Sequence, residues 1–354
     1  MKIAKNEIAI KLKQLKNVMP PRNSGIAPGV LFEKGTLTAT DLNLGLTTSM
    51  GVSSDETFII PANAIDLIES LPNENIEMGI VGKQFVVKSG SSRYKFAQIS
   101  AEDFPRVTFN ETTRKLFSCK ASDFADKISG VNYASMSNNN ESIYNGILIE
   151  SKNGGINIVG CDGYRLAWNY METNIETDFR LVVPQSSLRK FINMSTDGEA
   201  TFYSANSRVI IKTEEYTLSA LLMTGEFMKY EAAFPKKEQT RITFDRSEFL
   251  SSVKRFQLVK SDCKQSPVVV GCEANKLIVG GSSSVTEFYE EVPATDLPES
   301  MRIGFNAKFL SDALNSFNVD ELHMSYTADT APVVLTDGTL KAMILPVRLK
   351  EARV

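Results

Sequence analysis

Three side chains of this sequence could form a catalytic set in which a thiol attacks and a histidine transfers protons. Cys161 and Asp162 are adjacent, and His323 is the only histidine of the chain. A thiolate activated by a histidine is the nucleophile of cysteine-dependent hydrolases. His323, however, lies in residues 320–326, a predicted strand, and we expect it to be structural. A cysteine-dependent hydrolase therefore stays an open but disfavoured alternative.

Other signatures of catalysis or cofactor binding are absent from the sequence. It contains no G-x-x-x-x-G-K-[ST] phosphate loop, no G-x-S-x-G nucleophile turn and no H-E-x-x-H zinc motif. Its four cysteines form no C-x-x-C pair, and one histidine cannot complete a zinc-type ligand set. We therefore predict that the protein is not an enzyme and needs neither a cofactor nor a metal.

Basic side chains are concentrated on predicted helices, although the whole chain has a net charge of −3. Residues 5–17 and 246–260 each carry an excess of three positive charges. Lysine and arginine on helices suit contacts with the phosphates of nucleic acid, which carry no direct sequence information. The candidate DNA contacts on helices are Lys5, Lys13, Lys16, Arg189, Lys190, Lys254 and Arg255.

The elements that would position these side chains occur three times. Residues 58–71, 181–194 and 303–317 each read as a short apolar strand followed by an amphipathic helix. The helix starts in these segments are 123 and 122 positions apart. A second set of helix starts, near residues 4, 120 and 246, and a set of predicted strand residues, Tyr94, Tyr216 and Leu340, repeat nearly the same spacing. Such even spacing indicates one module used three times.

The segments between the helices alternate apolar and polar residues and carry turn signals. Residues 29–40 and 146–159 predict antiparallel hairpins that turn at Lys34-Gly35 and Asn153-Gly154. We predict an α+β fold of three tandem modules, each with two helices packed on an antiparallel sheet. Polar, proline-marked connectors place the domains at residues 1–114, 115–238 and 239–354.

Composition is that of a globular protein, with 42% hydrophobic and 23% charged residues. The first residues are too charged for the apolar core of a signal peptide, and no apolar run approaches the roughly 20 residues needed to span a membrane. We expect a cytoplasmic protein that does not bind membranes.

Three motifs carry a resemblance to a known family. G-C-D-G-Y-R-L-A at residues 160–167 resembles the T-D-G-H-R-L-A motif of bacterial sliding clamps, the beta subunit family of DNA polymerase III. I-G-F-N at residues 303–306 and L-P-V-R-L at residues 345–349 are similar to the I-G-F-N and M-P-M-R-L segments of that family. With the threefold architecture, the resemblance spans the chain.

The resemblance implies a head-to-tail dimer whose six domains form a closed ring around duplex DNA without sequence specificity. Such a ring gives processivity in DNA replication by tethering the DNA polymerase III catalytic subunit and other clamp-binding polymerases and repair proteins. It also implies an ATP-dependent clamp loader as a partner. A monomeric, non-specific nucleic-acid-binding module is the alternative, which the mass of the protein in solution would separate from a ring.

The resemblance also implies particular site residues. It places Arg22, Asn138 and Asn139 at the DNA, and a dimer interface at Phe104 on one side and at Leu258 and Val259 on the other. A hydrophobic groove for partner peptides is implied at Tyr144, Cys161, Gly163, Tyr164, Arg165, Leu166, Met228, Ala233, Asn306, Phe309, Pro332, Met343, Leu345, Pro346, Val347 and Arg348. We expect this groove to be apolar, to contain methionine and to be rimmed by an arginine.

The sequence departs from the family pattern at the expected groove. Cys161 replaces the usual threonine, Tyr164 the usual histidine and Met228 the usual proline, and residues 350–354 extend past the customary end. These differences leave open which peptides the groove prefers, what the added tail does and whether this clamp is chromosomal or carried on a mobile element.

Overall fold

The computed structural model describes residues 1–349 apart from 21–27, 53, 73, 107–112, 137–141, 236–239, 260–266, 274–275 and 283–286. The predicted DNA contacts Arg22, Asn138 and Asn139 and the tail at residues 350–354 lie outside the described residues. No helix in the described part of the chain is both long enough and apolar enough to cross a bilayer.

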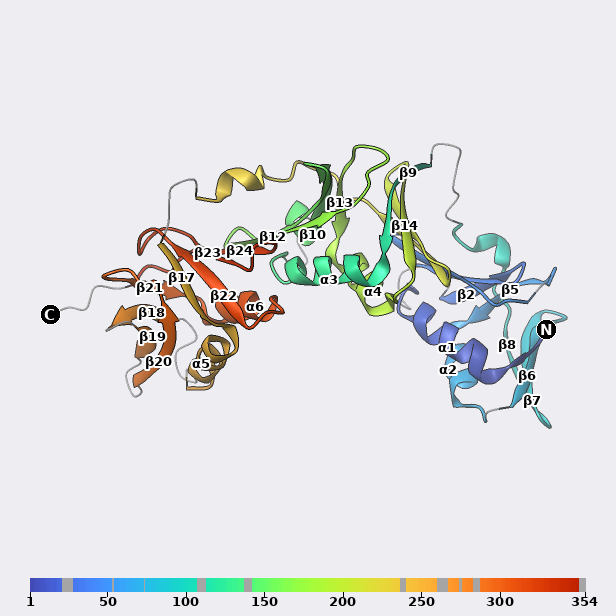
Figure 1. Cartoon of the computed structure of the whole chain (residues 1–354). Coiled ribbons are helices and arrows are strands. Elements are labelled where there is room, and N and C mark those ends of the chain that lie inside the picture. The colour runs from blue at the N-terminus through green and yellow to red at the C-terminus, as the bar shows by residue number, and fades with distance from the viewer. Residues whose placement is uncertain are drawn as a thin grey trace. The chain divides into compact units, whose positions relative to one another are not determined.

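The order of elements repeats three times (Figure 1). The first module contains β1 (Lys2–Ala4), α1 (Lys5–Lys16), β2 (Gly29–Glu33), β3 (Thr36–Thr40), β4 (Leu44–Ser49), β5 (Thr57–Pro61), α2 (Ala62–Ser70), β6 (Asn75–Val81), β7 (Gln84–Ser89), β8 (Ser92–Ala97) and the 3₁₀ turn η1 (Ala101–Asp103). Each half of the module is therefore a strand, a helix and three further strands, which confirms the predicted strand and helix repeat.

The second and third modules follow the same plan. The second contains β9 (Arg114–Lys120), α3 (Ala121–Asn132), η2 (Ile143–Asn145), β10 (Gly146–Lys152), β11 (Gly155–Cys161), β12 (Arg165–Glu172), β13 (Arg180–Pro184), α4 (Gln185–Met194), β14 (Glu199–Ala205), β15 (Arg208–Lys212), β16 (Tyr216–Leu221) and η3 (Tyr230–Ala233). The third contains β17 (Thr240–Asp245), α5 (Arg246–Val259), β18 (Val268–Glu273), β19 (Lys276–Ser282), β20 (Glu287–Thr295), β21 (Arg302–Phe305), α6 (Ala307–Asn315), β22 (Glu321–Tyr326), β23 (Val333–Thr336) and β24 (Lys341–Ile344). Leu340, predicted to lie in a strand, directly precedes β24 instead, because residues 337–340 form the turn before that strand.

By proximity of its residues the chain divides into two compact units, and the division runs through the second module. The first unit comprises residues 1–121 and 196–222, and the second comprises residues 122–195 and 223–354. The first unit holds a four-stranded sheet, β1-β6-β7-β8, and an eight-stranded sheet, β5-β2-β3-β4-β16-β15-β14-β9. The second holds a twelve-stranded sheet, β13-β10-β11-β12-β24-β23-β22-β17-β20-β19-β18-β21. The predicted domain boundaries stay a prediction.

Local sequence explains the turns and the helices. Both predicted hairpin turns have the two left-handed residues of a type I′ turn: φ is 47° and 75° at Lys34-Gly35, and 58° and 78° at Asn153-Gly154. The helices bury one face each, as α1 does with Ile8, Leu12 and Leu15. In α6 the side chain of Asn306 accepts hydrogen bonds from the first backbone N–H groups, which explains why that helix begins there.

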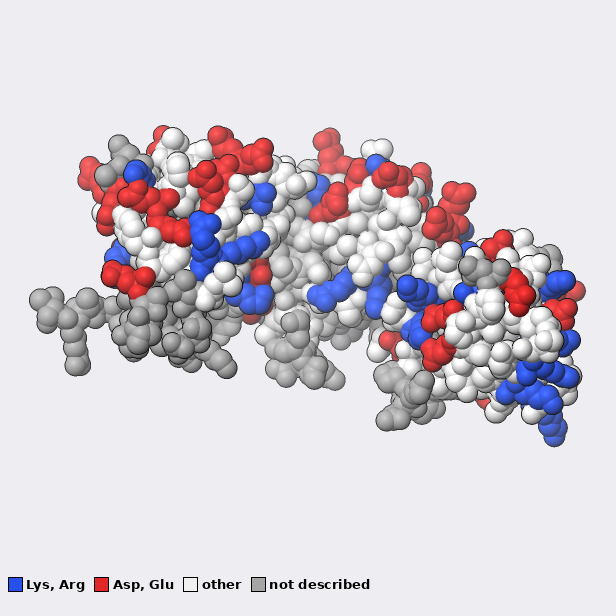
Figure 2. Space-filling model, turned by 90° about the horizontal axis from the view of Figure 1, so that it is seen from below, with Lys and Arg blue, Asp and Glu red and all other residues white. Residues whose placement is uncertain are grey.

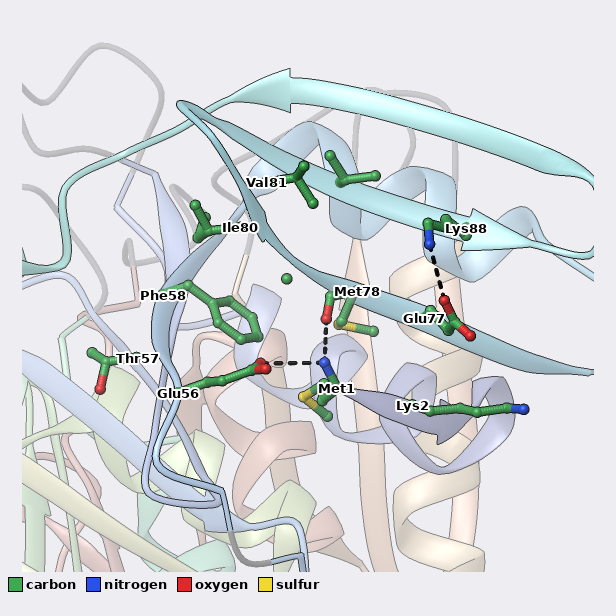
Figure 3. A pocket seen from close by; sticks show the side chains of 12 residues that line it. Met1, Lys2, Glu56, Thr57, Phe58, Glu77, Met78, Ile80, Val81 and Lys88 are labelled. Atoms are coloured by element: carbon green, nitrogen blue, oxygen red, sulfur yellow. Dashed lines mark hydrogen bonds and ion pairs between the residues drawn. The ribbon is translucent and has the colours of Figure 1, made fainter.

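A hollow of about 410 Å³ opens on the first unit between β5, β6 and β7 (Figure 3). Phe58, Met78 and Ile80 contribute its apolar lining, and the Lys88–Glu77 ion pair lies at its rim. None of the site residues predicted from the sequence lines this hollow.

Candidate functional site

An apolar cluster joins the second and third modules within the second unit. Strands β12 and β24 pair in antiparallel register and set Leu166 opposite Met343. Around this pair lie six of the residues predicted for the groove, namely Tyr144, Cys161, Leu166, Met228, Ala233 and Met343. We call these residues and the side chains packed with them the apolar cluster. The structure brings these six together from four separate segments of the chain.

Several members of the apolar cluster were missed in the sequence analysis. They are Leu148, Val159, Val182, Phe227, Tyr230 and Val334, with Ile143, Met223, Trp168 and Phe234 packed against them. Two aromatic rings, those of Tyr230 and Phe234, meet the indole of Trp168 at centroid distances of 5.2 and 5.5 Å. One signal could have found Trp168: it is two positions from Leu166 on one strand, so the two share a face of the sheet.

Two sulfur atoms meet in the cluster. The Cys161 thiol lies 3.6 Å from the Met228 thioether sulfur, and the backbone N–H of Gly163 donates to the thiol at 3.4 Å. Burial raises the pKa of the Cys161 thiol, which disfavours the thiolate that a nucleophile needs. His323 bonds instead to Thr243 on β17, at 3.0 Å. The contacts of these residues thus give no support to a cysteine-dependent hydrolase.

Arg165, one of the two arginines predicted for the groove, is an internal residue. It is only 8% exposed. Its guanidinium donates to Asp162 at 2.9 Å and to Asp312 of α6 at 2.8 Å. Its planar group also lies over the Phe309 ring, 4.4 Å from the centroid. Arg165 therefore fastens the loop before β12 to α6, as the flat, multiply donating guanidinium is suited to do.

Removing this fastening should destabilise the second unit. We expect Arg165→Met to lower the free energy of unfolding by about 3 kcal/mol, because the largely buried Asp162 loses its cation. Asp312 keeps only the ion pair with the exposed Lys308. Adding Asp312→Asn should recover part of the loss. Urea unfolding followed by emission of Trp168, the only tryptophan and a member of this unit, measures both effects. Equal stability of Arg165→Met and the wild type would contradict the role.

The surface beside Arg165 is aromatic and exposed. The Tyr164 ring, 64% exposed, lies 6.2 Å from the Phe309 ring. Asp162 accepts the backbone N–H of Tyr164 at 2.9 Å and that of Arg165 at 3.0 Å. The loop is further shaped by Gly163, whose φ of 89° favours glycine. The replacement of the usual histidine by Tyr164 thus places an exposed phenol ring at the expected groove.

The chain end crosses the same region. We call residues 345–349 the C-terminal strap. The backbone N–H of Leu345 donates to the Tyr164 carbonyl at 3.0 Å, and that of Val347 donates to the Gly304 carbonyl of β21 at 2.7 Å. Leu345, Val347 and Arg348 are exposed, so Arg348 can supply the rim arginine, while Pro346 is half-buried. The half-buried Pro332 directly precedes β23.

Acidic neighbours hold several of the predicted DNA-binding side chains. Lys16 forms ion pairs with Asp66 and Glu69 of α2, and the hydrogen bond to Asp66 raises the pKa of the Lys16 ammonium. Arg255 of α5 makes two hydrogen bonds to Glu290 of β20, at 2.7 and 2.6 Å, which lower the pKa of that carboxyl. These acids were not foreseen from the sequence, because they lie far along the chain.

The other predicted basic contacts lie on helices as expected. Lys13, Arg189 and Lys254 are exposed, and Lys5 and Lys190 are half-buried. Figure 2 shows the face of the molecule that is turned downward in Figure 1. In the part that holds α5 and α6, Lys and Arg side chains gather over the helices and Asp and Glu side chains lie along one edge. On the first unit acidic and basic side chains are mixed.

The residues predicted for a dimer interface differ in exposure. Leu258, near the end of α5, is 80% exposed, the most exposed of the large hydrophobic side chains that the structure describes. Phe104 is only 6% exposed and packs on Leu31 and Ile59. Val259 is the last residue of α5. A contact through Phe104 would therefore involve a side chain that already belongs to the core of the first unit.

Comparison with known proteins finds the same family along the whole chain. Models of the N-terminal, central and C-terminal domains of the DNA polymerase III beta subunit match residues 1–108, 118–229 and 231–348. The beta sliding clamp of Synechococcus elongatus is 24% identical to this chain, and the match covers 98% of each of the two proteins. The beta sliding clamp of Chlamydia muridarum is 23% identical, and that match covers 99% of each.

Solved structures agree in fold. A putative DNA polymerase III beta subunit from Eubacterium rectale superposes with a TM-score of 0.91 at 21% identity, covering 98% of this chain and 99% of the other. The DNA polymerase sliding clamp of Pseudomonas aeruginosa does so with a TM-score of 0.89 at 21% identity, covering 99% of each chain. The clamp fold of three modules is thus shared with these proteins.

Proposed function

The chain belongs to the DNA polymerase III beta subunit family, and from this membership we propose that two copies close head to tail into a ring that encircles duplex DNA. The ring would act without catalysis, in the cytoplasm, as a processivity factor of the replicative polymerase. The apolar cluster would hold peptides of the polymerase, the ATP-dependent clamp loader and other DNA polymerases and repair proteins.

The two strand junctions inside the chain support ring closure. In the first unit β4 of the first module pairs with β16 of the second. In the second unit β12 of the second module pairs with β24 of the third. Each junction joins the fourth strand of one module to the last strand of the next, in antiparallel register. The same type of edge is therefore used twice in succession.

Two strands of these kinds take part in neither junction: the last strand of the first module and the fourth strand of the third module. Among the described pairings β8, the last strand of the first module, pairs with β7 alone. β20, the fourth strand of the third module, pairs with β19 along its length and with β17 only at its C-terminal end. Two copies can thus repeat the internal junction by pairing β20 of one with β8 of the other. This repeated edge chemistry is the observation that carries the proposal, because head-to-tail contacts close into rings when the rotation allows.

The charge of the helices supports a loose hold on DNA. Lys13, Arg189 and Lys254 are exposed on helices, where they can contact phosphates but not base edges. Exposed charges more than about 10 Å apart are largely screened at 0.1 M salt. Weak contacts of this kind would let DNA slide, and closure of the ring would keep it from escaping.

Mass and retention together test the proposal. Light scattering should give twice the chain mass of 39.1 kDa, and the protein should remain on nicked circular DNA but leave after the circle is cut. A strict monomer at micromolar concentration would instead favour the monomeric nucleic-acid-binding module. Tight, sequence-specific binding to a short duplex would contradict both readings.

Freeing Arg255 should strengthen the hold on DNA. In Glu290→Gln this helix cation loses its carboxylate, and we expect about two- to threefold tighter binding to linear duplex at 50 mM salt. The slope of log affinity against log salt should steepen by at most about 0.9, the value for one further phosphate contact. Anisotropy titrations over a salt series measure both quantities.

Glu291→Gln is the matched control for this experiment. Glu291 is adjacent on β20 but forms its ion pair with Lys276 of β19, a strand residue. The control should leave the affinity and the slope nearly unchanged. If both variants tighten binding equally, the effect comes from total charge and the helices have no special part in it.

A further inference from the structure

A charged hollow of about 580 Å³ borders the apolar cluster. It is lined by Glu150, Lys152, Arg180, Lys229, Tyr230, Glu231 and Ala232. Tyr230 belongs to both places: its ring packs on Trp168 in the cluster, and its hydroxyl donates to Glu150 in the hollow at 2.8 Å. Tyr230, itself only 2% exposed, is thus the wall that the cluster and the hollow share.

Both carboxylates of the hollow are already paired with cations. Glu150, 6% exposed, receives the Tyr230 hydroxyl on one oxygen and Arg180 on the other. Both oxygens of Glu231 accept from Lys152, each at 2.7 Å. A cationic ligand would find these carboxylates occupied and two lysines and an arginine nearby, so the hollow does not suit a cation.

Two cations of the hollow, Arg180 and Lys229, still have N–H groups free to donate to a ligand. Arg180 donates to Glu150 and to the Phe227 carbonyl, the latter at 3.3 Å, while a guanidinium has five N–H donors. About half of the Arg180 side chain is exposed. Lys229 is exposed, and no described residue forms an ion pair with its ammonium. The lining has three cationic and two anionic side chains, and its one positive charge in excess favours an anionic group.

We propose that the hollow binds a carboxylate of the same peptide whose apolar anchors occupy the cluster, through Lys229 and Arg180. This inference rests on the proposed function of the cluster. The carboxylate is an acidic side chain or the C-terminus of the peptide, since either presents the same acceptor atoms. It makes the hollow a specificity site that selects among peptides with similar apolar anchors.

Fluorescence anisotropy with synthetic peptides tests the proposal. The probe is labelled Gly-Ser-Leu-Ser-Leu-Phe-Gly-Ser-Gly with an amidated end, with Asp or Asn placed at each Gly or Ser position in turn. One of the Asp peptides should bind about three- to tenfold more tightly than its Asn counterpart at low salt, and the gap should narrow at high salt. A probe that ends in a free carboxylate instead of the amide tests whether the C-terminus of the peptide, and not an acidic side chain, occupies the hollow.

Variants locate the effect. Lys229→Ala should remove the preference for Asp while leaving the affinity of the neutral probe unchanged, and Lys229→Glu should favour a peptide with Lys at that position. Lys212→Ala, which removes an exposed lysine of the first unit, should preserve the preference. Arg180 is unsuitable for substitution, because its loss would leave Glu150 buried without its cation.

The outcomes separate this inference from the function on which it rests. If the neutral probe binds but Asp and Asn peptides bind equally at every position, or the preference survives Lys229→Ala, the carboxylate site is wrong and the apolar cluster keeps its function. If no probe binds at all, the peptide-binding function itself fails and the carboxylate site fails with it.

Discussion

Replacing Leu258 by lysine should convert the protein into a monomer that circular DNA cannot retain. Leu258 is 80% exposed, so a lysine there should leave the fold of the single chain intact. Its helix lies against β20: Phe256 packs on Phe288 with ring centroids 5.6 Å apart, and Arg255 pairs with Glu290. The side chain is thus near the strand that we propose to pair with β8 of another copy.

The expected size of the effect follows from the closed geometry. Burying an unpaired ammonium in an interface costs several kcal/mol after relaxation. A head-to-tail dimer contains the interface twice, so that even about 2 kcal/mol at each contact would weaken dimerisation by roughly a thousandfold. Light scattering at micromolar concentration and retention on nicked circles both report the loss.

A control and an alternative substitution sharpen this prediction. Leu42→Lys places a lysine at another exposed leucine, in the turn before β4, and should leave the dimer intact. A charge at Phe104 is less informative, because that side chain is buried against Leu31 and Ile59 and the substitution would destabilise the fold itself. The proposed interface would be refuted if the Leu258→Lys protein had the melting temperature of the wild type, remained dimeric and was retained on nicked circular DNA.

The sequence was sufficient for the repeated elements because their signals are local. An apolar strand, a helix start and a hydrophobic face need only neighbouring residues, as α2, α4 and α6 illustrate. The turn at Lys34-Gly35 was equally predictable, because its second left-handed residue is a glycine, which adopts that conformation at no steric cost. The paired edges β4–β16 and β12–β24 were not predicted, since antiparallel pairing between distant strands leaves no local trace.

The candidate site was predicted only in part for the same reason. Cys161 and Met343 were predicted through the resemblance, whereas Phe227 and Tyr230 were not predicted for the groove, although both belong to the apolar cluster. The inward position of Arg165 could not be predicted, because its partner Asp312 is 147 positions away. A long-range ion pair decides whether an arginine faces a ligand or the interior, and sequence spacing cannot show it.

Removing residues 347–354 should abolish peptide binding while the dimer stays intact. The C-terminal strap is held at two points by backbone hydrogen bonds, to Tyr164 and to Gly304. It contributes the exposed side chains of Val347 and Arg348 beside the apolar cluster. With these removed, a peptide loses apolar contact and the rim cation together, and we expect affinity to fall by more than a factor of ten. Anisotropy titration with the labelled, amidated peptide that lacks Asp measures this affinity.

Gly304→Ala provides a point substitution with the same physical target. A Cβ at Gly304 would lie 2.8 Å from the Val347 carbonyl oxygen and 2.6 Å from a methyl carbon of Leu349, so the strap must shift. Gly280→Ala on β19 is the matched control, because its Cβ would meet the nearest atom at 3.5 Å, an ordinary contact. Peptide affinity should fall in the first variant and hold in the second, with both proteins dimeric. If truncated protein binds the probe as the wild type does, the strap is not part of the groove, and the apolar cluster alone must hold the peptide.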